Sequence, residues 1–314
     1  MTNFNYRLID PCGKDQEDYK KIHNELFKGA AIDSHWIEWY HYKVRASDNR
    51  LSHTRTYGLF DNTRLIGIWS VEPKIMRNSN NELITVGRCF AVGISSDYRR
   101  MGLFVSLSEF AIESERRRAE FEYIIGFPQT GRSVVGGHIK AGWEEISLID
   151  IYSINLNSNE SGLSRKDVTN VIDFSNITTP LSTINSFDEP PSYRNIRFLA
   201  HPTLQYIIYS FSDAYIVLKP YSMFCHILEI QGSKENAIRL IEVSKSVCKR
   251  HGLVELNVWN NPNTSYNDIL VECGFSSGAQ HGLPISVIAV SINAKNKLLL
   301  ENEFNFGMGV EEGY

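Results

Sequence analysis

Residues 97–104 constrain the fold of this chain more than any other stretch. They read Asp-Tyr-Arg-Arg-Met-Gly-Leu-Phe, after an extended apolar run at Cys89–Ile94 and before a long helical pattern over Leu103–Ala119. A strand that turns tightly into a helix presents free backbone N–H groups at the positive end of the helix. Such an end binds phosphate groups, and Gly102 lacks the Cβ that would keep a phosphate away from the main chain. The stretch therefore predicts a diphosphate-binding turn, with two adjacent arginines adding positive charge.

The pattern around this turn predicts an α/β (α+β) fold, in which a mostly antiparallel mixed sheet is flanked by helices. Alternating and helical hydrophobic spacings give the order β-α-α-β-β-β-α-β-α-β. The predicted strands are Tyr6–Asp10, His53–Phe60, Leu65–Met76, Leu83–Ile94, Tyr123–Phe127 and Trp143–Ile154. The predicted helices are Gln16–Lys28, a second helix capped by Ser34, the helix after Gly102, and Ser133–Lys140.

The second half partly repeats this order. We predict strands at Ile227–Ile230, Val254–Trp259 and Pro284–Ser291, and helices at Glu235–Arg250 and Ser265–Glu272. The similar segments that follow Phe127-Pro128 and Asn261-Pro262 indicate an internal duplication. The predicted division is a first domain over residues 1–154, a polar linker over residues 155–192 and a second domain over residues 193–314.

Charge and cysteine content exclude several classes of protein. The 314 residues carry a net charge of −4, which argues against a general nucleic-acid or anionic-membrane binder. No apolar run has the length of a membrane span, and the N-terminus lacks a basic segment followed by an apolar one. The five cysteines are scattered, which predicts reduced thiols without a disulfide or a zinc site. We therefore expect a cytoplasmic protein that contacts neither nucleic acid nor membrane.

Residues 88–143 resemble the GNAT superfamily of CoA-dependent N-acyltransferases. The superfamily motif R/Q-x-x-G-x-G/A matches at Arg99 and Gly102 and departs at Phe104, where a small residue is usual. The later strand–helix–Gly–aromatic element of the family resembles Tyr123–Trp143. The resemblance covers about residues 5–154, and because the second half resembles a degenerate copy, the whole resembles a tandem GNAT chain.

The resemblance implies an acyl-CoA co-substrate, acetyl-CoA or a longer acyl-CoA, and no metal. The pantetheine arm would pair with the fourth strand at Val92 and Ile94, where a backbone N–H can stabilise the tetrahedral oxyanion. The pyrophosphate would lie on the turn formed by Arg99, Arg100, Met101, Gly102, Leu103 and Phe104.

The catalytic groups are less clearly marked. In the superfamily a tyrosine four residues before the terminal glycine of the short helix often protonates the leaving thiolate; with Gly142 as that glycine, the position here is His138. Histidine can donate or accept a proton near neutral pH, although it can equally be a packed residue near a helix end. The fourth strand has no carboxylate near Val92, so the candidates for a general base are Glu72, Asp33 with its neighbour His35, or an ordered water chain.

The acceptor is expected near the second helix, as in the family. Trp36, Tyr40 and His41 are candidates to stack on or hydrogen-bond a sugar or nucleobase; alternatively, Trp36 and Tyr40 form the core face of that helix. The second half lacks the diphosphate turn and has Leu270 four residues before Gly274. We expect it to complete the acceptor pocket or to replace a partner subunit.

The segment Gly126-Phe127-Pro128-Gln129 is similar to GNAT enzymes of bacterial surface-sugar pathways. This implies an N-acyltransferase acting on a nucleotide-linked amino sugar, bound to dTDP or UDP, for lipopolysaccharide or capsule synthesis, as a monomer or homodimer. One alternative is a tandem-GNAT transferase that uses aminoacyl-tRNA, which the mild acidity disfavours. The other is a catalytically silent CoA-binding pseudo-acyltransferase.

Overall fold

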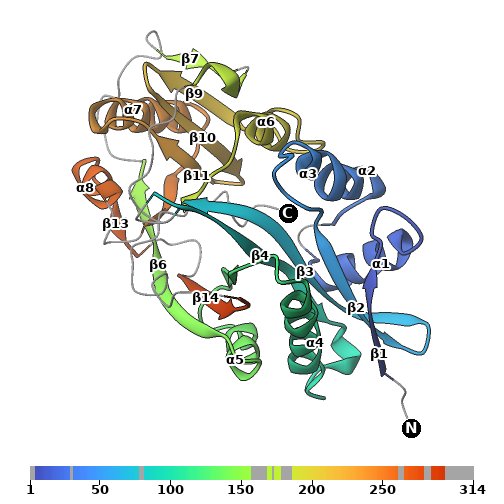
Figure 1. Ribbon diagram of the computed structural model, residues 1–314. Coiled ribbons are helices and arrows are strands. Elements are labelled where there is room, and N and C mark those ends of the chain that lie inside the picture. The colour runs from blue at the N-terminus through green and yellow to red at the C-terminus, as the bar shows by residue number, and fades with distance from the viewer. Residues whose placement is uncertain are drawn as a thin grey trace.

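The computed structural model describes residues 4–28, 31–77, 81–156, 168–171, 173–177, 186–260, 265–278 and 284–293. Its strands form one continuous sheet in the order β1-β2-β3-β4-β5-β14-β6-β12-β11-β10-β9-β7 (Figure 1). These strands are β1 (Phe4–Ile9), β2 (Arg55–Asp61), β3 (Arg64–Arg77), β4 (Leu83–Ile94), β5 (Tyr123–Gly126), β6 (Glu144–Asn155), β7 (Thr169–Asn170), β9 (Ile207–Phe211), β10 (Ala214–Tyr221), β11 (Phe224–Gln231), β12 (Glu255–Asn260) and β14 (Ile285–Ser291). Two short strands, β8 (Ser186–Phe187) and β13 (Ser276–Ser277), pair with β3 and β6.

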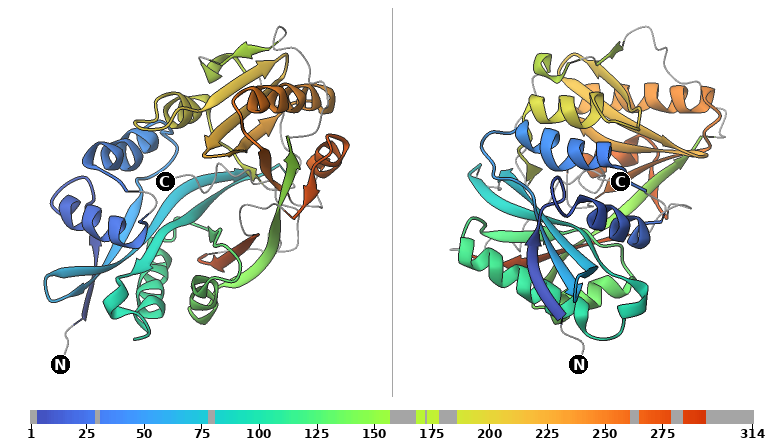
Figure 2. Two further views of the ribbon diagram at one scale, coloured as in Figure 1. Left: turned by 180° about the vertical axis from the view of Figure 1, so that it is seen from behind. Right: turned by 90° about the vertical axis from the view of Figure 1, so that its right-hand side faces the viewer.

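Helices cover both faces of the first half (Figure 2). The helices of the chain are α1 (Gln16–Leu26), α2 (Ser34–Glu38), η1 (Trp39–Lys43), α3 (Val44–Ala46), η2 (Ser96–Tyr98), α4 (Leu103–Arg118), α5 (Ser133–Lys140), η4 (Phe174–Asn176), α6 (Pro191–Arg194), η5 (Asn195–Leu199), α7 (Lys234–Arg250) and α8 (Ser265–Glu272). The apolar side of α4 packs on one face of the sheet, against residues such as Tyr57 and Trp69. Helices α1 and α2 pack on the opposite face, against residues such as Ile68 and Phe90. The α/β class and the order of the first-half elements are as predicted.

The second helix differs from its prediction in two ways. Its N-cap is Asp33, whose carboxylate accepts the backbone N–H of Trp36 at 2.7 Å, and Ser34 is the first helical residue. After Glu38 the chain forms the π-helical turn η1 before α3. A π turn widens the helix by one residue, and here its Trp39, Tyr40 and His41 are buried.

Two strands join the halves into one sheet. β6 pairs with β14 along Glu144–Ile149 and with β12 along Asp150–Asn155. β14, the last of the described strands along the sequence, inserts between β5 and β6. The sequence predicted this strand within the second domain, but its position in the sheet is in the first half. The division at residues 154 and 193 stays a prediction, because the sheet is continuous across it.

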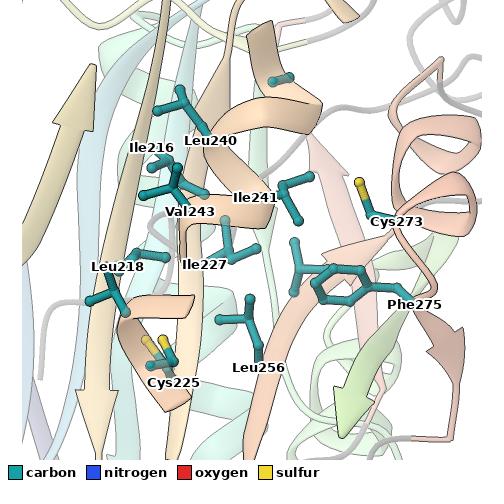
Figure 3. Packing of buried hydrophobic residues seen from close by; sticks show 14 of the residues in the cluster. Ile216, Leu218, Cys225, Ile227, Leu240, Ile241, Val243, Leu256, Cys273 and Phe275 are labelled. Carbon is teal, nitrogen blue, oxygen red and sulfur yellow. The ribbon is translucent and has the colours of Figure 1, made fainter. Parts of the chain in front are cut away.

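The second half contains a hairpin that the sequence analysis did not predict. β9 and β10 pair antiparallel around a turn at Ser212, which has φ +54°. Helix α7 packs its apolar side on β10, β11 and β12, where Leu240 and Ile241 contact a core that includes Ile227 and Leu256 (Figure 3). In the predicted linker, β7 pairs with β9 and β8 with β3, so these described parts belong to the sheet.

No helix in the described ranges is long and apolar enough to cross a membrane.

Candidate functional site

The turn between β4 and α4 has the backbone geometry that a diphosphate requires. Arg100 has φ +65°, and Gly102, the N-cap of α4, has φ +77°. A Cβ added at Gly102 would meet no atom within 4 Å, so the space beside the turn is open. The first N–H groups of α4 have no intrahelical partner, and Arg100, Met101 and Gly102 are exposed. The turn therefore fits a phosphorylated ligand.

Side chains of α1 and β2 and a backbone carbonyl of β4 fix this turn. The Ser95 hydroxyl donates to Glu25 of α1 at 2.6 Å, and the backbone N–H of Ser96 donates to the same carboxylate at 3.2 Å. The Tyr98 hydroxyl donates to Asp61 at the end of β2 at 2.8 Å. Arg99 donates through Nε to the carbonyl of Ile94 at 3.2 Å, which leaves its terminal nitrogens for a ligand. The turn is thus held before any ligand arrives.

β4 and β5 separate next to this turn. They pair in parallel over three residues only, Val86–Arg88 with Tyr123–Ile125. β4 continues to Ile94 while paired to β3 alone, so no described strand covers its other edge. We call residues 89–94 the splayed edge of β4. An extended ligand with amide groups can add to such an edge by backbone hydrogen bonds.

A β-bulge distorts the splayed edge at the predicted thioester site. The β3–β4 register shifts between Ser70↔Phe90 and Ile68↔Gly93, and Ala91 has φ +46°. A left-handed alanine is strained, and such strain concentrates at ligand-binding sites. The bulge places Val92 half-exposed, whereas Ile94 is buried, with only 6% exposed. Both predicted pantetheine positions lie on this edge, and their roles stay predictions.

His138 lies on α5 between two aromatic rings. The ring centroids of Phe104 and Trp143 are 5.1 and 4.6 Å from that of His138, both edge-on. Burial lowers the pKa of His138 to about 4, so the ring is neutral at pH 7. Its buried Nδ1 has no hydrogen-bond partner in the described structure. His138 can therefore offer only a neutral N–H, which makes it a weaker proton donor than the sequence prediction assumed.

Glu72 is part of a buried ion network. Its carboxylate, which has no solvent exposure, pairs with Lys74 at 3.0 Å and with Arg88 of β4. It also accepts the hydroxyls of Tyr40 at 3.2 Å and Tyr193 at 3.3 Å. A carboxylate held between two cations is a poor base because they stabilise its ionised form. The contacts give Glu72 a structural function, and the catalytic one stays a prediction.

Two cationic members of this network, Lys74 and Arg88, were not among the predicted site residues. Lys74 also pairs with Glu189 at 2.5 Å and lies 3.8 Å from the ring centre of Tyr193. The sequence contained a signal for a buried charged site, because charged residues at alternate positions of an otherwise apolar strand, such as Glu72 and Lys74 of β3, are unusual. Two of the residues that Lys74 contacts, Glu189 and Tyr193, lie more than 100 residues away, however, and so could not be identified.

The other predicted residues of the α1–α2 region have packing and capping contacts. Asp33 is exposed and caps α2, as described above. Trp36 stacks on Tyr40 with centroids 4.8 Å apart, and both are buried. His41 shares a hydrogen bond of 3.1 Å with the hydroxyl of Tyr19. These three rings form the core face of the helix, so a role in stacking on an acceptor stays a prediction.

In the second half, the helix that corresponds to α4 is α7, and the carboxylate of Asp213 lies at its N-terminal end. At the beginning of α7, the backbone N–H and hydroxyl of Ser233 donate to Asp213 at 3.0 and 3.1 Å. Asn236 also donates to Asp213, at 2.5 Å, and these bonds lower the pKa of Asp213. Leu270 is buried in the core of α7 and α8. An internal anion therefore occupies the place that a phosphate would take.

No metal-binding cluster of three or more His, Cys, Asp or Glu side chains occurs among the residues that the structure describes.

Comparison with known proteins adds evidence at the level of fold. No protein-family model matches the sequence, and no curated protein matches it. A GCN5-related N-acetyltransferase from Anabaena variabilis superposes with a TM-score of 0.66 at 12% identity, over 93% of this chain and 73% of that chain. A probable N-acyltransferase from Enterococcus faecalis gives 0.65 at 12% identity, over 93% and 73%. The N-myristoyltransferase of Saccharomyces cerevisiae with bound myristoyl-CoA gives 0.59 at 9% identity, over 92% and 83%. The chain therefore has the fold of the GCN5-related N-acetyltransferases across both halves.

Proposed function

We propose that this protein is an acyl-CoA-dependent N-acyltransferase whose first half binds the acyl-CoA. The observation that carries the proposal is the combination of the splayed edge of β4 with the left-handed Gly102 turn. The edge offers backbone groups to the amides of a pantetheine arm, and the turn offers N–H groups to a diphosphate. Coenzyme A carries these two parts in this order.

In the proposed reaction an acceptor amine attacks the thioester carbonyl directly in a ternary complex. The C–N bond forms, the C–S bond breaks, the amine loses a proton to solvent or a base, and the thiolate gains one. The N–H at Val92 would donate to the carbonyl oxygen as negative charge develops there. An amine with a pKa below that of lysine needs little help from a general base, which is consistent with the engagement of Glu72 in ion pairs.

The acceptor we propose is the amine of a nucleotide-linked amino sugar, in a cytoplasmic pathway of surface polysaccharide synthesis. Its support is the sequence similarity at residues 126–129, together with a net charge of −4, which does not favour RNA binding. This finer proposal does not depend on the acyl-CoA site. If the acceptor is a different amine, the proposal that the first half binds acyl-CoA still stands.

A CoA-binding protein without catalysis is the second candidate, and two observations favour it. β4 contains no Asp or Glu, and His138 is neutral and enclosed by aromatic rings. Thiol release from acetyl-CoA, measured with panels of amino sugars, polyamines and amino-acid amides, separates the two. Turnover with any amine supports the enzyme; tight acetyl-CoA binding without turnover supports the second candidate; absence of acetyl-CoA binding refutes both.

A further inference from the structure

A row of polar side chains crosses four strands of the second half. Register places Lys219 of β10 opposite His226 of β11, His226 opposite Asn257 of β12, and Asn257 opposite Ser153 of β6. Their strand neighbours Leu218, Ile227 and Leu256 point into the core beneath α7 (Figure 3). Because side chains alternate along a strand, the polar row lies on the opposite face of the sheet. We call this set of four residues the polar row.

Asn257 stands out in this row. It is fully buried, and both its Oδ1 and its Nδ2 lack a hydrogen-bond partner in the described structure. Buried amides in native proteins are almost always hydrogen-bonded, and an unpaired one destabilises the fold. The N–H and C=O groups of such a carboxamide can form hydrogen bonds with a ligand that carries one acceptor and one donor.

The polar row lies on the side of the sheet that meets the acyl-CoA half. Trp259, two residues further along β12, packs in one cluster with Ile125 and Phe127. Its ring centroid is 6.3 Å from that of Phe127, the residue that follows β5. Ile125 pairs with Arg88 at the point where β4 and β5 separate. The strand that carries Asn257 thus packs against the acyl-CoA half beside the point where β4 and β5 separate.

We infer that Asn257 binds the acceptor at a point away from the reacting amine. The ligand group is a cis N–H/C=O pair, as in the imide of a pyrimidine base or in a primary carboxamide. Such a pair matches the donor and acceptor of an asparagine side chain in two parallel hydrogen bonds, the pairing that asparagine makes with base edges. That the bound molecule is an acyl acceptor rests on the proposed function. Binding of the molecule to Asn257 can be measured without turnover.

The test combines stability with binding for Asn257→Leu and a control, Asn24→Leu. The Asn24 amide is satisfied on both sides, since it donates to the carbonyl of Ile32 at 3.0 Å and accepts the N–H of Ile32 at 2.8 Å. We expect Asn24→Leu to lower the melting temperature. Asn257→Leu should leave it unchanged or raise it, because an apolar side chain of similar size replaces unpaired polar atoms.

Binding is measured by calorimetry with uridine 5′-diphosphate and with glycinamide as separate probes. Their blocked analogues are the N3-methyl nucleotide and glycine methyl ester. We expect at least one probe to bind the wild type, its blocked analogue to bind at least tenfold more weakly, and Asn257→Leu to lose at least tenfold. The probe that binds tells which source supplies the group.

Acetyl-CoA is titrated in parallel, so that failure of the proposed function is seen separately, as lack of binding to the wild type. The inference is overturned if neither probe binds the wild type or if Asn257→Leu binds both probes normally. A fall in melting temperature for Asn257→Leu as large as that for Asn24→Leu also overturns it.

Discussion

Replacement of Gly102 by alanine is expected to weaken acyl-CoA binding roughly tenfold or more, at a modest cost in stability. Gly102 is left-handed, with φ +77°, and an added Cβ would meet no protein atom within 4 Å. The stability cost is therefore only that of holding an L-residue in the left-handed region, about 1–2 kcal/mol. The new methyl group would occupy the open space beside the first N–H groups of α4, where we place the diphosphate. Loss of one hydrogen bond to a charged group is worth about 1.5–3 kcal/mol, which is a loss in affinity of roughly tenfold or more.

Gly252→Ala is the matched control for this change. Gly252 follows α7 in the second half, has φ +73° and also has no atom within 4 Å of an added Cβ. Both variants should therefore lower the melting temperature by similar amounts, a few degrees for a chain of this size. Titration calorimetry with acetyl-CoA should show weakened binding for Gly102→Ala only. Equal affinity of the two variants would show that the diphosphate does not lie on this turn.

Variants at Glu72, Gly137 and His138 test the neighbouring structure. Glu72→Gln should destabilise the fold by about 3–5 kcal/mol, because it removes the buried carboxylate that pairs with Arg88 and Lys74, and only Lys74 keeps a second carboxylate, Glu189; a stable but inactive variant in urea unfolding would instead indicate a catalytic base. Gly137→Ala should destabilise by about 1–3 kcal/mol, since its Cβ would lie 2.6 Å from the ring of Phe104, and Phe104→Ala should restore stability in the double variant. The pKa of His138 falls from 6.5 to about 4 on folding, so the unfolded state takes up a proton at this histidine at a higher pH than the folded state does. The contribution of His138 to the free energy of unfolding should be fully present above pH 6.5 and should decrease by up to about 3 kcal/mol as the pH falls to 4. His138→Phe should make the free energy of unfolding less dependent on pH in this range; an unchanged dependence would contradict the lowered pKa. Normal thiol release by His138→Ala would remove its role as proton donor.

The buried ion network around Glu72, Lys74 and Arg88 could not be predicted from the sequence. Glu72 and Arg88 face each other on β3 and β4, yet Tyr193, which donates a hydrogen bond to Glu72, comes from α6, more than 100 residues later. Charges buried in pairs are stable only when all partners are present. An alternating strand pattern shows that a charged residue is inside but not which residue neutralises it.

The sequence by itself determined the turn at residues 97–104 and the order of elements in the first half. Both follow from local chemistry: a glycine that adopts a left-handed conformation, arginines beside a helix start, and apolar residues at strand or helix spacing. Only the tertiary structure decided that β14 enters the first half between β5 and β6, and that Asp213 accepts hydrogen bonds at the N-terminal end of α7. It also decided that Asn257 is buried with no hydrogen-bond partner among the residues that the structure describes. These features depend on which strands pair over long separations, and that choice is made by packing of the whole chain rather than by the preferences of any one segment.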